Sequence, residues 1–162
     1  GRYEYRRLCC SDRHEVWQFM ERWRQHKEEV GAMELSLDYE GVEETVLTDK
    51  KWLGFVIGQI LSNALKYTKK GKISIYMSKA RSHTLVIEDT GIGIRPEDLP
   101  RVFEKGFTGS NGRNGKKSTG MGLYLCRRLC EKLGIAIEAE SVCGEGTKMI
   151  LTFPVSSYLS KL

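Results

Sequence analysis

The sequence predicts an α/β fold of two layers, in which a mixed β-sheet is covered on one face by helices. Three observations indicate this class. Short segments of alternating apolar residues, typical of strands, occur on both sides of a long helical segment. A second helical segment begins after a glycine-rich stretch, and a final pair of alternating segments follows it. Helices with one apolar stripe bury that stripe against a sheet of this kind.

The expected elements follow one another along the whole chain. Strands are predicted over residues 5–9, 33–39 and 46–48, with a helix capped by Asp12 after the first of them. The remaining elements are a long helix over 49–67, strands over 73–77 and 85–88, a short helix over 96–103, a helix over 121–133, and a hairpin over 135–142 and 147–153. Gly71 is predicted to terminate the long helix. No repeat or second unit is evident, so residues 1–162 are expected to form one domain.

The composition is that of a folded, soluble protein. Of the 162 residues, 40% are hydrophobic, 29% are charged and only three are proline. The net charge of +5 suits a phosphate-bearing ligand, although a solvated surface with a slight excess of lysine is the default explanation. This charge is well short of a nucleic-acid-binding composition, so no nucleic-acid partner is expected. The longest apolar run, residues 53–61, is interrupted by Gln59 and is too short to span a bilayer.

The five cysteines favour a reducing, cytoplasmic environment. Their number is odd, two are adjacent, and no C-x-x-C spacing occurs, which argues against a disulfide framework and against a zinc site. Cys126 and Cys130 share one helix face and are expected to be small packing residues. The start at Gly1 is expected to be a boundary within a longer protein.

The long predicted helix carries a polar stripe beside its apolar one. The apolar stripe comprises Leu53, Ile57, Ile60 and Ala64. The polar stripe places Gln59 and Asn63 one turn apart and continues with Tyr67, with Lys66 alongside. Uncharged amides next to a buried stripe either have a function or have to be satisfied at a cost.

Two glycine-rich segments favour a bound anion or nucleotide. Asp89 follows an apolar strand and precedes Gly91 and Gly93, a spacing that indicates close backbone approach. The segment 106–122 contains six glycines and several basic residues, and it ends where a helix begins. Neither the P-loop motif nor the Rossmann glycine motif is present, so a phosphate site here belongs to another nucleotide fold.

Five motifs in order resemble those of sensor histidine kinases. Residues 59–68 (QILSNALKYT) resemble the N box, 89–93 (DTGIG) the G1 box, 103–107 (FEKGF) the F box, 120–123 (GMGL) the G2 box, and 144–147 (GEGT) the last glycine motif. The resemblance covers nearly all of the chain after Asp49 and implies the Bergerat ATP-binding fold. Residues 51–53 (KWL), 106–109 (GFTG) and 111–113 (NGR) further resemble the bacitracin-sensing subgroup.

The resemblance implies a role for each residue of the nucleotide site. Asn63 would ligate Mg²⁺ through its neutral oxygen, although a buried asparagine satisfied by backbone is the structural alternative. Asp89 would accept a hydrogen bond from the adenine amino group, where an ordinary turn aspartate is the alternative. Gly91 and Gly93 would let the backbone curl under the base. Thr147 would hold the adenine edge, unless it is an ordinary strand threonine.

Further residues are expected near the ribose and phosphates. Lys66 would approach the phosphates, and Tyr67 would lie near the base or ribose, with core packing as its alternative. Backbone amides presented to the phosphates would come from Gly120, Gly122 and Leu123.

The F-box region departs from the family pattern. Many members follow the residue equivalent to Phe107 with an aromatic–arginine pair, whereas Thr108 and Gly109 follow it here. Arg113, Lys105 or Lys116 is left as the candidate contact to the γ-phosphate. Phe103 and Phe107 are expected to anchor a lid, to pack into the core, or both.

The expected reaction is phosphoryl transfer from Mg-ATP to a protein histidine. Related ATPases carry a glutamate where Gln59 stands, and an amide cannot take a proton from water. The family's acceptor histidine lies on a separate helical hairpin. His14 lacks the continuation of an acceptor motif and, like His26 and His83, is not assigned that role, so the acceptor is expected outside this chain.

The resemblance therefore implies the catalytic domain of a protein-histidine kinase in two-component signal transduction. It is expected to be a cytoplasmic, monomeric part of a membrane-anchored sensor that works with its own histidine hairpin and a response regulator. Two alternatives stay open at this point. One is a stand-alone serine kinase of the anti-sigma type, and the other is a degenerate ATP-binding module used for protein interaction.

Overall fold

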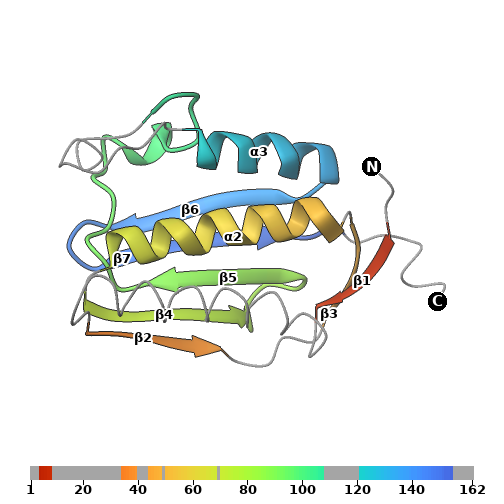
Figure 1. Ribbon diagram of the computed structural model, residues 1–162, viewed down its shortest axis with the longest axis horizontal. Coiled ribbons are helices and arrows are strands. Elements are labelled where there is room, and N and C mark those ends of the chain that lie inside the picture. Colours follow the sequence, from red (N-terminus) through yellow and green to blue (C-terminus); the bar gives the residue numbers. More distant parts are fainter. Residues whose placement is uncertain are drawn as a thin grey trace.

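The computed structural model describes residues 4–8, 34–39, 44–48, 50–68, 70–107 and 121–154, and the side chains of the last three of these ranges from Trp52 on. Its main sheet has five strands in the order β2-β4-β5-β7-β6 (Figure 1). Their bounds are β2 Glu34–Tyr39, β4 Lys70–Met77, β5 Thr84–Asp89, β6 Ala136–Val142 and β7 Gly146–Thr152. The β2–β4 pair is parallel and the other three pairs are antiparallel, so the prediction of a mixed sheet is confirmed.

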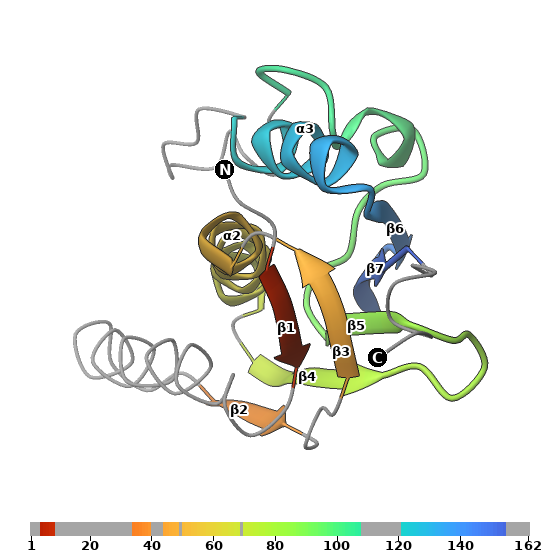
Figure 2. The same ribbon diagram turned by 90° about the vertical axis from the view of Figure 1, so that its right-hand side faces the viewer.

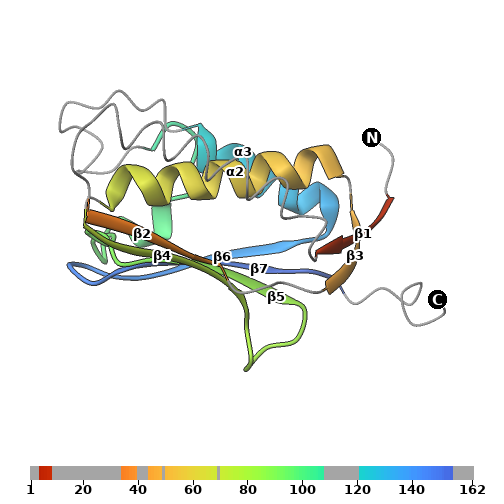
Figure 3. The ribbon, with the colours of Figure 1, turned by 60° about the horizontal axis from the view of Figure 1, so that its bottom comes forward.

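Two helices cover one face of this sheet. They are α2, Lys50–Tyr67, and α3, Gly122–Leu133, and Figure 3 shows both above the strands. The two-layer architecture predicted from the sequence is therefore present. The strands β1, Glu4–Leu8, and β3, Glu44–Thr48, form a separate antiparallel pair at the end of the molecule where α2 begins (Figures 1 and 2). The helix predicted after Asp12 lies outside the described residues.

The core lies between the helices and the sheet. The apolar stripe of α2 is largely as predicted: Leu53, Ile60 and Ala64 are buried, whereas Ile57 is half-buried and packs against the core. The remaining core side chains come from α2, α3 and the inward positions of the strands, and they include Val56, Leu61, Ile73, Ile75, Leu85, Ile87, Met149 and Leu151. Among the described residues, no helix combines the length and the apolar character that crossing a membrane requires.

Cys126 and Cys130 are fully buried packing residues on α3, as predicted. Burial raises the pKa of the Cys126 thiol to about 12 and that of the Cys130 thiol to about 11. Both thiols therefore stay protonated and unreactive at neutral pH.

Two local predictions were wrong. Gly71 does not end the long helix: α2 ends at Tyr67, and Gly71 lies within β4 with φ 131°, where a Cβ would meet the Thr90 side chain. A glycine with positive φ is favoured in both settings, so its presence alone could not distinguish them. The short helix predicted over 96–103 is reduced to a 3₁₀ turn, η2, at Leu99–Arg101.

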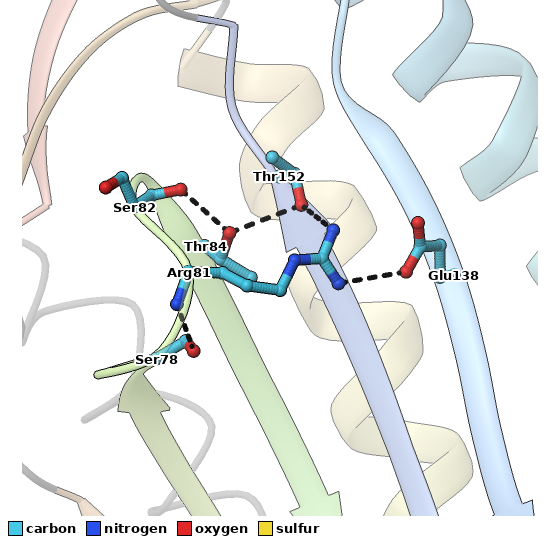
Figure 4. Close-up of polar contacts among 6 residues, drawn as sticks. All are labelled: Ser78, Arg81, Ser82, Thr84, Glu138 and Thr152. Carbon is cyan, nitrogen blue, oxygen red and sulfur yellow. Dashed lines mark hydrogen bonds and ion pairs between the residues drawn. The ribbon is translucent and has the colours of Figure 1, made fainter.

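Side chains join the turn between β4 and β5 to the strands β7 and β6 (Figure 4). The Arg81 guanidinium forms an ion pair with Glu138 at 3.1 Å and donates to Thr152 Oγ1 at 3.2 Å. The Thr84 hydroxyl donates to the Ser82 carbonyl at 2.9 Å and lies 3.3 Å from Thr152 Oγ1. These contacts hold the end of the sheet opposite to the one at which β5 terminates.

Candidate functional site

The site is organised around Asp89, the last residue of β5. Asp89 is only 9% exposed, and the Gly91 N–H donates to Asp89 Oδ1 at 2.9 Å. Burial raises the pKa of this carboxyl above its ordinary value of 3.8, whereas hydrogen bonds from the backbone of Gly91 and Thr147 and the neighbouring Thr68 hydroxyl work in the opposite direction. A buried carboxylate with remaining acceptor capacity is suited to a donor on a ligand.

The glycine loop after Asp89 sits directly on the end of α2. The Ile92 N–H donates to the Tyr67 carbonyl at 3.2 Å. A Cβ on Gly91 would meet that same carbonyl and would come within 2.6 Å of Thr68 Oγ1. Gly93 has φ 72°, and a Cβ there would meet the Val142 carbonyl. Both glycines are thus required by the close approach of the chain to itself, which fixes the loop beside Asp89.

Ser141 joins this loop to the start of β7. Its Oγ accepts from the Ile94 N–H at 2.7 Å and donates to the Gly146 carbonyl at 2.7 Å. Since its single proton is used there, the Thr147 hydroxyl, 3.0 Å away, is the donor in their mutual contact. Thr147 Oγ1 therefore keeps its lone pairs for another partner. Sequence reasoning missed Ser141, whose only signal was a hydroxyl on an inward strand position opposite Thr147.

The predicted polar stripe lies along α2 as expected. Gln59, Asn63, Lys66 and Tyr67 are all half-buried. Gln59 Oε1 lies 2.7 Å from the position that a Cβ on Gly122 would occupy, so this amide meets the first residue of α3. Lys66 Nζ lies 5.2 Å from the centre of the Tyr67 ring. The structure thus brings together the N-box helix, the glycine loop and the N-terminus of α3.

Two arginines lie over the F-box aromatic rings. The Arg101 guanidinium is 4.4 Å from the centre of the Phe107 ring, and that of Arg127 is 5.2 Å from the centre of the Phe103 ring. Phe103 also packs against the core. Leu123 packs there too, so only its backbone amide is available to a ligand. No pattern in the sequence indicated these two arginines.

Part of the predicted site cannot be placed. Gly120 and Arg113 lie outside the described residues, as do Thr108, Gly109 and Lys116. Lys105 is described and is exposed. Within the described part of the chain, no group of three or more His, Cys, Asp or Glu side chains is arranged to hold a metal ion. A single amide oxygen, as predicted for Asn63, is the kind of ligand that suits Mg²⁺, which keeps several waters and bridges phosphates.

A buried carboxylate, a glycine loop seated on a helix end and an amide-bearing helix facing the start of a second helix are the features expected of a nucleotide-binding domain. The chain belongs to the family of histidine kinase-, DNA gyrase B-, and HSP90-like ATPases, whose model matches residues 48–157. The predicted recognition of a histidine-kinase-type ATP-binding domain is confirmed by this match and by the relatives below.

Curated relatives are sensor kinases. The chain is 49% identical over 110 residues to the sensor protein BceS of Halalkalibacterium halodurans. This match covers 67% of this chain and 33% of that protein. The chain is 43% identical over 122 residues to BceS of Bacillus subtilis, covering 75% of this chain and 36% of that protein. It is 41% identical over 133 residues to the sensor protein kinase GraS of Staphylococcus aureus, covering 82% and 38%. The matched part of the chain therefore covers about a third of the length of these relatives.

Solved structures show the same fold. The mycobacterial sensor histidine kinase MprB matches with a TM-score of 0.70 at 22% identity, over 94% of this chain and 97% of that one. The catalytic domain of the histidine kinase ThkA matches with a TM-score of 0.68 at 22% identity, over 93% and 95%. The predicted Bergerat-type fold is thereby confirmed.

Proposed function

We propose that this chain binds Mg-ATP and donates the γ-phosphoryl group to a histidine on a separate dimerisation hairpin of the same sensor kinase. The observation that carries the proposal is the convergence of Asp89, its glycine loop and the polar face of α2 at one end of the sheet. The family match supports ATP as the nucleotide, and the kinase relatives support transfer to histidine.

The residues have distinct proposed roles in nucleotide binding. Asp89 accepts from the adenine amino group, while Gly91, Gly93 and Thr147 shape the edge on which the base lies. Tyr67 lies near the base or ribose, and Lys66 approaches the phosphates. Backbone amides of Gly120, Gly122 and Leu123 bind the phosphates at the N-terminus of α3, where unpaired N–H groups favour anions.

Asn63 is the proposed protein ligand of Mg²⁺. Its side chain lies one turn after Gln59 on α2, and an amide oxygen suits a hard cation. When bound, the ion neutralises charge on the phosphates. Phe107, held under Arg101, is proposed to anchor the lid, and Arg113 is the proposed lid contact to the phosphates.

In the proposed reaction the bond from γ-phosphorus to the β,γ-bridging oxygen breaks as a bond forms to an imidazole nitrogen of the acceptor. The electron pair of the broken bond leaves with ADP, and the imidazole proton passes to solvent. Gln59 is an amide and cannot activate water as a base. Positioning and electrostatic stabilisation therefore supply most of the catalysis, and hydrolysis stays slow.

The remaining expectations on the whole protein are part of the same proposal. The matched segment makes up only 33–38% of each relative, which supports a single catalytic domain within a longer sensor kinase. We place this domain in the cytoplasm, attached to a membrane-anchored sensor of the bacitracin-sensing type and acting with a response regulator. The domain itself is expected to be monomeric, because the dimerisation hairpin lies elsewhere.

Isothermal titration with a non-hydrolysable ATP analogue tests the binding step. We expect saturable binding that strengthens with Mg²⁺ and loses this Mg²⁺ dependence in Asn63→Ala. Addition of labelled ATP and the purified histidine hairpin of the same kinase tests the transfer step, where phosphohistidine is expected. Binding without transfer would support the interaction module instead, and no binding would refute the proposal.

A further inference from the structure

The Thr68 side chain is a buried polar group that the proposed roles leave unexplained. The residue follows directly after α2 and is 0% exposed. Its hydroxyl is buried without a hydrogen-bond partner of standard geometry among the described residues. A buried hydroxyl of this kind costs about 1–3 kcal/mol, so its presence needs an explanation. A valine would fill nearly the same space without that cost.

The hydroxyl lies close to two parts of the site that contact the base in the proposed complex. A Cβ on Gly91 would come within 2.6 Å of Thr68 Oγ1. The Asp89 carboxylate is also a neighbour, and hydrogen bonding by the Thr68 hydroxyl lowers its pKa. Oδ1 of this carboxylate already accepts the Gly91 N–H, and a carboxylate has room for several further donors. Thr68 is thus placed to orient the Asp89 carboxylate, which binds the base in the proposed complex.

We propose that Thr68 is a positioning residue that determines adenine specificity, because its hydroxyl donates to Asp89 when a 6-amino purine is bound. The carboxylate is then held in the orientation that accepts the adenine amino group. The contact between the Thr68 hydroxyl and Asp89 reaches standard hydrogen-bond geometry at the same time, so part of the cost of burying the hydroxyl is recovered on binding. This inference rests on the proposed function, since it requires the base to lie against Asp89.

Thr84 offers a matched control elsewhere in the fold. It is also a buried threonine, 1% exposed, but its hydroxyl is paired with Ser82 and Thr152. Thr84→Val removes a satisfied hydroxyl far from Asp89, at the opposite end of β5. We expect it to lower the Tm of the unliganded domain by roughly 2–4 °C and to leave nucleotide affinity unchanged.

The test compares ATP with purine riboside triphosphate, which lacks the 6-amino group. Thr68→Val is expected to weaken ATP binding about tenfold, equivalent to ~1.4 kcal/mol, and to leave binding of the amino-free analogue unchanged. Thr68→Ser, which keeps the hydroxyl, is expected to retain most of the ATP affinity. The Tm of unliganded Thr68→Val should equal or exceed that of the wild type, unlike that of Thr84→Val. In an Asp89→Asn background, Thr68→Val should have no further effect.

Each other outcome overturns the inference. Unchanged ATP affinity in Thr68→Val would show that the hydroxyl has no part in binding, while the proposed function stands. Equal losses for both nucleotides would show that it does not act through Asp89. If the valine variant does not fold, Thr68→Cys, whose thiol is a weak donor, is used, and an unchanged ratio of the two affinities refutes the inference. Absence of ATP binding by the wild type refutes the proposed function and this inference with it.

Discussion

The two ends of β5 treat buried polar side chains in opposite ways. At the end where β5 begins, Thr84 is paired with Ser82 and Thr152, and Arg81 joins the same cluster to Glu138 (Figure 4). At the end where β5 terminates, burial of the Asp89 carboxyl raises its pKa. The Thr68 hydroxyl next to it has no partner of standard geometry among the described residues.

This difference distinguishes groups that serve the fold from groups held for a ligand. Polar groups that only stabilise a fold are expected to satisfy one another. Groups that bind a ligand keep some hydrogen-bonding capacity unused, and the unliganded protein is less stable for it. We therefore expect changes at the Asp89 end to separate binding from stability, and changes at the Thr84 end not to do so.

Asp89→Asn is expected to have the largest effect on binding. Loss of the charged acceptor should weaken ATP binding on the order of 100-fold, since hydrogen bonds to charged groups contribute about 1.5–3 kcal/mol. The unliganded variant should be at least as stable as the wild type, because burial disfavours the carboxylate. Titration calorimetry and thermal unfolding measure the two quantities. Equal ATP affinity in both proteins would remove Asp89 from the site.

Gly91→Ala should impair both properties. Its Cβ would meet the Tyr67 carbonyl and Thr68 Oγ1, and overpacking against backbone costs about 1–3 kcal/mol. We expect lower stability in denaturant unfolding and weaker ATP binding, because the loop has to move. Gly58→Ala is the control, since Gly58 lies in α2 with nothing within 4 Å of a Cβ. That change should stabilise the domain by roughly 0.5–1 kcal/mol.

Acidification is expected to weaken ATP binding through Asp89. The bound amino group favours the carboxylate, so affinity should fall as the pH drops through the raised pKa of Asp89, by about tenfold per pH unit below it. The stability of the unliganded domain changes with pH in the opposite direction. The folded state binds this proton more tightly, so the contribution of Asp89 to stability is lost as the pH rises from 3.8 through the raised pKa.

Asp89→Asn provides the control for the pH profile. The triphosphate titrates in the same way with both proteins, so the difference between their profiles isolates the carboxyl group. Parallel profiles for the two proteins would contradict the assignment.

Arg81→Ala should have the smallest effect. Its ion pair with Glu138 joins side chains that are 46% and 49% exposed, and such surface pairs contribute about 0–1 kcal/mol. We expect a Tm within a few degrees of the wild type and unchanged ATP affinity. A clear change in ATP affinity would show that the two ends of β5 are coupled, contrary to the expectation that only the Asp89 end contributes to binding.

Much of the fold follows from the sequence because its signals are local. Alternation located the described strands of the main sheet to within one residue at each end, except that β4 begins three residues before the predicted start, and helical spacing located α2 and α3. Gly71 was wrongly assigned as a helix terminator. A glycine is required there because Thr90, which follows the neighbouring strand β5, approaches it closely, and this contact joins residues distant in sequence. The segment 96–103 was read as a helix although its residues form only one 3₁₀ turn.

The candidate site was predictable where residue type and spacing carry the chemistry. Asp89, Gly91, Gly93 and the polar stripe of α2 were singled out by pattern, and the structure brings the aspartate, its glycines and the end of α2 together. Ser141 and the arginines over Phe103 and Phe107 were missed, since their roles depend on contacts between segments far apart in sequence. The Thr68 hydroxyl was missed because an unsatisfied group is recognised only once its surroundings are known.

A crystal structure of this domain with Mg²⁺ and a non-hydrolysable ATP analogue would show directly whether Asp89 binds the base. We expect the adenine amino group within hydrogen-bond distance of the Asp89 carboxylate, with Thr68 Oγ1 donating to that carboxylate and Mg²⁺ on the Asn63 oxygen. A base bound away from Asp89, or side chains of the protein occupying the space beside this carboxylate, would contradict this expectation.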